Sequence, residues 1–206
     1  MFLFNSRDDV LYVLRQIGER LAQPAEAVLY GGCAVILMGR SGRNTDDLDL
    51  DCRENSTLLA TAKQVAGELN AVADLTYVVE EFIDVPPALL KPHERYGQFG
   101  LLTVYLCDPA IIAASKMDRR SEQDVKDVQW LLSSGLLEPE RFKRCVEASN
   151  EYEDKPSVLE SMQEMLGITV QRESPTTRRS PTKMRAILAI VILAVLIAIV
   201  LLAVTR

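Results

Sequence analysis

A glycine pair and a set of alternating aspartates are the residues whose types and spacing could carry out chemistry. Gly31 and Gly32 follow a short apolar run at 27–30, and such a turn into a helix exposes backbone N–H groups that can bind a phosphate. Asp47 and Asp49 lie two positions apart, so both carboxylates should project from one face of a strand. Paired carboxylates bind Mg²⁺, which bridges the oxygens of a triphosphate. The segment therefore predicts a magnesium-dependent triphosphate site.

The elements that must position these residues follow from hydrophobic periodicity and from helix caps. We expect a helix at 8–23 capped by Ser6, a strand at 27–30, a short helix at 33–38 and a strand at 48–52. A helix at 56–70 capped by Asn55 follows, then strands at 75–79 and 101–106, with 86–98 as a surface loop. After Asp108 only helices are expected, at 110–120, 122–133, 139–150 and 157–166. The pattern predicts an α/β fold with a mixed sheet and flanking helices, followed by a helical C-terminal half.

The glycine turn and the aspartate strand together resemble the signature of the nucleotidyltransferase superfamily. The segment is most similar to the bacterial branch related to AbiEii-type abortive-infection toxins, which reads GGxAxxLxG followed by RxTxDLDL. The matching positions are Gly31, Gly32, Ala34, Leu37, Gly39, Arg43, Thr45, Asp47, Leu48, Asp49 and Leu50. The second half is similar to the same branch through Asp108–Pro109, Lys116, Arg119, Arg120 and the Lys126–Asp127 pair before Trp130. The resemblance covers residues 27–135.

The resemblance implies a role for each matching side chain. The turn residues Gly31, Gly32 and Cys33 would contact the nucleotide phosphates, and Asp47 and Asp49 would hold Mg²⁺. Lys116 would neutralise the triphosphate, and Asp127 would orient that lysine or close the cleft. The nucleotide-binding set also takes in Arg43 and Thr45. The implied reaction is attack of an acceptor hydroxyl on the α-phosphate of a nucleoside triphosphate, with pyrophosphate leaving.

Two departures from the family pattern leave a second hypothesis open. Cys33 stands where many relatives carry a serine, and a thiol is a weaker donor to phosphate than a hydroxyl. The third carboxylate of active members has three candidates in this sequence, Asp74, Asp84 and Asp108. The alternative to an enzyme is therefore a catalytically degenerate nucleotidyltransferase fold that acts as a membrane-anchored binding or regulatory module.

Composition limits the other classes of function. The chain has 206 residues and a net charge of −6; six of its 23 Lys and Arg residues but only one of its 29 Asp and Glu residues lie beyond residue 170, so the preceding body is acidic. An acidic body is unsuited to sequence-independent binding of nucleic acid. The four cysteines form no CxxC pair and there is one histidine, which disfavours a zinc site or a disulfide framework. Without an N-terminal signal sequence, we expect the body to lie in the reducing cytoplasm.

A C-terminal membrane anchor is predicted at 186–204. This run contains only Ala, Ile, Leu and Val, and as a helix it would span about 28 Å, close to the thickness of a bilayer core. Residues 171–185 are rich in Pro, Ser, Thr and Arg, which predicts a flexible basic linker. The basic flank places the N-terminal body in the cytoplasm as a single-pass protein.

The predicted organisation therefore has four parts. Residues 1–106 form a nucleotidyltransferase-like core, 107–170 a helical half that completes the cleft, 171–185 the linker and 186–204 the membrane helix. Beyond the nucleoside triphosphate and Mg²⁺, the expected partners are the membrane, an acceptor that is a tRNA, a protein or a small molecule, and a cognate antitoxin. The cognate antitoxin is expected because the resemblance implies that this protein is one component of a toxin–antitoxin or phage-defence pair.

Overall fold

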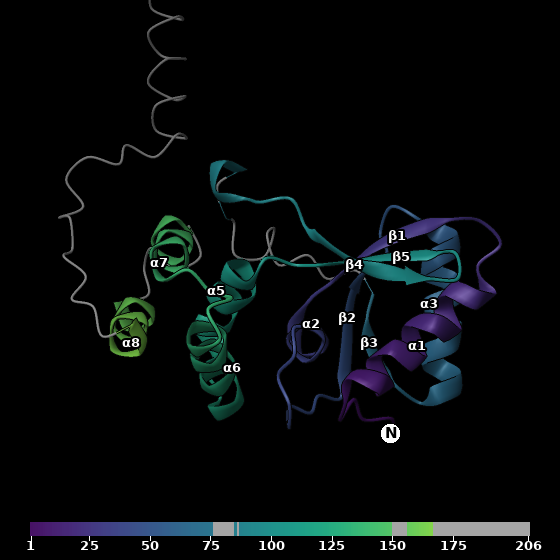
Figure 1. Cartoon of the computed structure of the whole chain (residues 1–206), viewed down its shortest axis with the longest axis horizontal. Helices are drawn as coiled ribbons and strands as arrows, with labels where there is room; N and C mark the ends of the chain where they lie inside the picture. Colours follow the sequence, from purple (N-terminus) through teal and green to yellow (C-terminus); the bar gives the residue numbers. More distant parts are fainter. Residues whose placement is uncertain (76–84, 86, 150–155, 167–206) are drawn as a thin grey trace, which may run out of the picture. The chain divides into compact units, whose positions relative to one another are not determined.

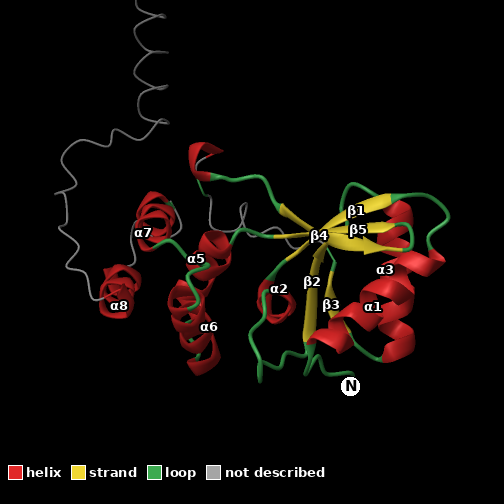
Figure 2. Ribbon diagram, in the orientation of Figure 1, coloured by secondary structure: helices red, strands yellow, loops and turns green. Residues whose placement is uncertain are grey.

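The computed structural model describes residues 1–75, 85, 87–149 and 156–166. Its first half carries a five-stranded mixed sheet in the order β3-β2-β1-β5-β4, and its second half is helical (Figures 1 and 2). The predicted mixed α/β architecture is thus confirmed. Among the described residues, no helix combines the length and the apolar character needed to cross a membrane. The predicted linker at 171–185 and membrane helix at 186–204 lie outside the described residues.

The strands pair in a register that fixes which side chains share a face. The bounds are β1 Ala25–Leu29, β2 Asp47–Asp51, β3 Val72–Asp74, β4 Glu94–Phe99 and β5 Leu102–Leu106. Strand β1 is antiparallel to β2 and parallel to β5, β2 is parallel to β3, and β4 is antiparallel to β5. Because side chains alternate along a strand, Asp47, Asp49 and Asp51 all lie on one face.

The opposite face of the sheet is buried beneath two helices. Helix α1 (Arg7–Arg20) packs against α3 (Ser56–Leu69) and contacts β4 and β5. The predicted caps are confirmed, since Ser6 accepts from the N–H of Asp9 at 3.2 Å and Asn55 accepts from that of Leu58 at 2.9 Å. This hydrophobic core contains Val10, Val13, Leu14, Ile17, Leu29, Leu48, Leu50, Leu58, Val65, Leu102 and Val104. The aspartate face is left for the short helix α2 (Gly31–Leu37), which contacts β2, and for the helical half.

The helical half consists, among the described residues, of α5 (Pro109–Arg119), α6 (Glu122–Ser133), α7 (Pro139–Ala148) and α8 (Pro156–Leu166). All four helices match the prediction. Asp108 caps α5 by accepting from the N–H of Ala110 at 2.9 Å, and it also forms an ion pair with Arg141 of α7. Helix α5 contacts α6, α7 and α8, so it forms the centre of this half.

Between residues 70 and 100 one prediction was wrong and one short strand was missed. The segment 86–98 is not a loop throughout, because it contains a short 3-10 helix at Pro87–Leu89 and most of β4. Strand β4 is an edge strand that is mostly exposed or half-buried, so it lacks the alternation that reveals a strand, and only its pairing with β5 makes it one. Of the strand expected at 75–79, residue 75 is not in a strand and residues 76–79 lie outside the described residues; strand β3, at Val72–Asp74, was not predicted.

Candidate functional site

A cavity of about 880 Å³ lies on the aspartate face of the sheet. One wall comes from β2, β3 and the start of α2, and it carries the carboxylates of Asp47, Asp49 and Asp74. The other wall comes from α5 and α6 and carries Lys116 and Arg119, while Arg43 enters from the loop before β2. The cavity thus has an acidic wall and a basic wall. That pairing suits a ligand with both anionic groups and a bound cation.

The glycine pair fits closely against the acidic wall. Gly31 has a φ of 57°, and a Cβ atom there would lie 1.8 Å from Oδ2 of Asp49. A Cβ at Gly32 would lie 2.7 Å from a guanidinium nitrogen of Arg43 and 2.8 Å from Oγ1 of Thr45. The Tyr30 N–H donates to the carbonyl of Asp49 at 2.9 Å and ties the turn to β2. A side chain at either position would overlap these neighbours, so the turn requires glycine. Backbone N–H groups in the first turn of a helix have no intrahelical partner, and both glycines line the cavity.

The acidic wall gathers three carboxylates that repel one another. Asp49 faces Asp74 in the parallel register of β2 and β3. Burial, followed by the charges of Asp47 and Asp74, raises the pKa of Asp49 to about 7, while Lys116 and Arg119 oppose that rise. The hydroxyl of Thr45 donates to Oδ1 of Asp47 and fixes its orientation. A cation placed between these carboxylates would remove the repulsion that disfavours their ionised form.

The donor set suits magnesium better than a metal that needs a complete protein cage. Among the described residues, no group of three or more His, Cys, Asp or Glu side chains is arranged to hold a metal ion. Mg²⁺ usually takes one or two protein carboxylates and completes its octahedron with water and substrate phosphates. Asp47 and Asp49 meet that requirement. They are the residues that would hold the ion once a triphosphate is bound.

The basic wall is held in place by Asp124. Lys116 Nζ lies 3.0 Å from Oδ1 of Asp124, and Arg119 donates to both oxygens of the same carboxylate at 2.8 Å. Burial raises the pKa of Asp124, but hydrogen bonds from Arg119 and Ser121 and the charge of Lys116 lower it more, so its pKa lies well below the usual range. The side chain of Arg119 is 70% exposed. It can therefore reach a ligand in the cavity while it stays paired.

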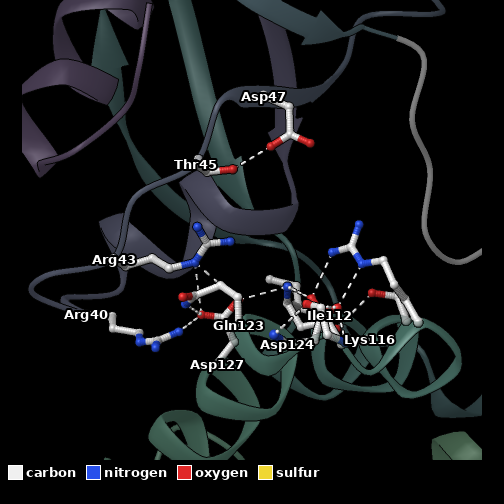
Figure 3. Close-up of polar contacts among 12 residues, drawn as sticks. Arg40, Arg43, Thr45, Asp47, Ile112, Lys116, Gln123, Asp124 and Asp127 are labelled. Atoms are coloured by element: carbon white, nitrogen blue, oxygen red, sulfur yellow. Dashed lines mark hydrogen bonds and ion pairs between the residues drawn. The ribbon is translucent and has the colours of Figure 1, made fainter.

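Asp127 connects the two halves of the site. Its carboxylate is completely buried, forms ion pairs with Lys116 Nζ at 2.9 Å and with Arg40, and accepts a hydrogen bond from Arg43 Nε at 3.1 Å (Figure 3). Arg40 and Arg43 belong to the loop before β2, whereas Lys116 lies on α5. Burial lowers the pKa of Lys116 and of Arg43, and the nearby carboxylate of Asp124 opposes both shifts. Asp127 thereby joins the α/β part to the helical part.

The structure brings most of the predicted site residues together. The cavity lining includes Gly31, Gly32, Arg43, Thr45, Asp47, Asp49 and Lys116. Asp127 lies behind the lining and acts on it through Lys116 and Arg43. Cys33 is also buried away from the cavity, where its thiol donates to the backbone carbonyl of Asp47 at 3.3 Å. Burial, followed by the charges of Asp49 and Asp47, raises the pKa of the Cys33 thiol well above its usual value.

Among the described residues, one of the three candidates for the third carboxylate of the site lines the cavity. Asp74 lines the cavity beside Asp49, whereas Asp108 caps α5 and pairs with Arg141. Asp84 lies outside the described residues. Sequence reasoning gave no site role to Arg119 or Asp124, although both line the cavity. The spacing of Lys116, Arg119 and Asp124 could have revealed them, because it places a lysine, an arginine and an acid on either side of the turn between α5 and α6.

This fold and site define a class of protein. A mixed sheet that presents a glycine turn and paired aspartates to a basic helical wall is the arrangement of a nucleotidyltransferase domain. Residues 9–164 match the model of a family described as "Nucleotidyltransferase of unknown function (DUF6036)", and the chain belongs to that family. Comparison with curated proteins and with solved structures gave no match. The membership confirms the superfamily, while the closer relation to AbiEii-type toxins stays a prediction.

Proposed function

We propose that this protein transfers a nucleoside monophosphate from a nucleoside triphosphate to an acceptor hydroxyl, with magnesium as its cofactor. The observation that supports this best is the pairing of the acidic wall with the basic wall across one cavity of about 880 Å³. Magnesium, when bound, neutralises the triphosphate and polarises its α-phosphate. The remaining work falls to residues of this chain.

Each part of the cavity has a separate task in this proposal. The backbone of Gly31 and Gly32 binds phosphate oxygens, since both residues line the cavity at the start of helix α2. Arg119 and Lys116 offset the negative charge that grows on the leaving pyrophosphate. Asp47 and Asp49 hold the metal. Asp74, on the neighbouring strand, accepts the proton of the acceptor hydroxyl.

The decisive experiment separates binding from transfer. We would titrate the full-length protein with each nucleoside triphosphate by calorimetry, with and without Mg²⁺, and measure pyrophosphate release with cell extract as the acceptor source. The test variant is Asp47→Asn/Asp49→Asn, and the matched control is Asp8→Asn/Asp9→Asn, which changes the net charge equally on helix α1. Magnesium-dependent binding and release that vanish only in the test variant would support the proposal.

Other outcomes would support other readings. Binding without release, in the presence of extract, would favour the alternative of a nucleotide-binding module. The thiol of Cys33 does not line the cavity, so its weakness as a donor to phosphate does not decide between the two readings. No binding by the folded protein would refute both readings. A toxin or phage-defence role, a cognate antitoxin and the membrane anchor stay predictions from the sequence.

A further inference from the structure

A second cavity, of about 460 Å³, lies on the same face of the sheet as the aspartates. Its lining includes Glu26 of β1, Asp51 of β2, Tyr105 of β5 and His93 from the segment before β4. Asp51 is two residues beyond Asp49 on the same strand, so its Cα lies about 7 Å from that of Asp49. The second cavity therefore begins one side-chain row away from the proposed metal ligands.

The side from which the acceptor hydroxyl approaches the α-phosphate indicates what the second cavity binds. The basic groups Arg43 and Lys116 lie toward the start of β2, because Arg43 precedes the strand and pairs with the same Asp127 as Lys116. The pyrophosphate that these cations favour would therefore leave toward the start of β2. In phosphoryl-group transfer the attacking and leaving oxygens lie roughly in line. The acceptor hydroxyl must then enter from the end of β2, which is the side of the second cavity.

The charge of the second cavity selects among acceptors. Its lining carries the carboxylates of Glu26, Asp51 and Glu54 against the single guanidinium of Arg53, which is itself paired with Asp51 at 3.0 Å. The hydroxyl of Tyr105 donates to Glu26 at 3.1 Å and holds that carboxylate at the cavity. A lining with excess negative charge repels phosphates and attracts ammonium groups. Aromatic rings such as Tyr105 also stabilise cations.

We propose that the second cavity is the acceptor subsite and that it takes a hydroxyl-bearing molecule with one or more ammonium groups. This inference rests on the proposed function. The acceptor oxygen forms a bond to the α-phosphorus, the bond from that phosphorus to the bridging oxygen breaks, and pyrophosphate leaves with the electron pair. The hydroxyl proton goes to the Asp74 carboxylate. A nucleic acid acceptor is disfavoured because its phosphates would face three carboxylates.

Two full-length variants test the subsite. The cavity variant is Glu26→Gln/Asp51→Asn/Glu54→Gln, which keeps the side-chain shapes and removes the charges. The matched control is Glu19→Gln/Glu140→Gln/Glu160→Gln, which removes three exposed charges from helices α1, α7 and α8. Spermidine binding is measured by calorimetry, and ATP·Mg²⁺ binding is measured on the same samples. Transfer from ATP is compared between 1,3-diamino-2-propanol, glycerol, glycerol 3-phosphate and a short RNA hairpin.

The cavity variant is expected to bind spermidine roughly 10-fold more weakly or worse, since each carboxylate adds a modest attraction, and the control is expected to match the wild type. Transfer to the diamine should exceed transfer to the other acceptors, and that preference should vanish in the cavity variant. Equal spermidine binding by both variants, a preference for glycerol 3-phosphate or RNA, or no transfer to the diamine would overturn the inference. If the wild-type protein does not bind ATP·Mg²⁺, the proposed function itself is refuted, and the acceptor role is refuted with it.

Discussion

The buried carboxylate of Asp127 offers the sharpest test of how the site is held together. The change Asp127→Asn keeps the shape of the side chain and removes its charge. Asp127 is fully buried, and its partners Lys116, Arg40 and Arg43 are at most 11% exposed. Breaking a buried ion pair by neutralising one partner costs about 3–5 kcal/mol, because the remaining charges cannot return to water. That is a large share of the 5–15 kcal/mol by which a typical domain is stable, to order of magnitude.

Urea unfolding of the full-length protein measures this cost. Trp130 is the only tryptophan in the chain and lies on the same helix as Asp127, so its fluorescence reports on the junction. With a typical dependence of about 1–3 kcal/mol per molar urea, the midpoint should fall by roughly 1–5 M. The matched control is Glu68→Gln, which removes the charge of an exposed pair between Glu68 and Arg20. Its midpoint should equal that of the wild type.

A loss of less than about 1 kcal/mol in the free energy of unfolding of Asp127→Asn, the range of an exposed pair, would refute a buried ion pair as the support of this junction. Such a result would mean that water or another anion satisfies Lys116 and both arginines once the carboxylate is neutral. The junction between the α/β part and the helical part would then depend on apolar packing. An equal loss in the Glu68 control would point to net charge, and not to burial, as the cause.

Three further predictions follow from the same geometry. Gly31→Ala should abolish nucleotide binding in calorimetry, because it strains a residue with φ of 57° and drives a methyl group into Asp49; Gly67→Ala, with nothing near its Cβ in helix α3, should bind normally. Asp124 has a lowered pKa, so its contribution to stability is present above about pH 4 and is lost as the pH falls further. Urea midpoints between pH 6 and pH 3 should therefore fall less steeply in Asp124→Asn than in the wild type, and parallel curves would contradict this. Mg²⁺ with ATP should raise the Tm of the wild type by mass action and leave the Tm of Asp49→Asn unchanged; an equal rise in both would place the metal elsewhere.

Short stretches of the sequence were enough to predict the local features of this protein. Helix caps such as Ser6 and Asn55, the glycine turn and the period-two aspartates are written in short stretches of chain, and all of them form as expected. These signals depend on contacts within a few residues, so they survive without knowledge of the fold. They also identified the superfamily, which the match over residues 9–164 confirms.

Only the tertiary structure decided which charges share the site. Asp74 meets Asp49 because β2 and β3 pair in parallel, and no spacing in the sequence distinguishes it from Asp108, whose carboxylate is used to cap α5. Strands β3 and β4 were missed for the same reason, since edge strands are defined by their partners. The hydrogen bond from Arg43 to Asp127 joins residues that are 84 positions apart in the sequence. Contacts between residues so far apart depend on how the helices pack against the sheet, and local sequence patterns do not predict them.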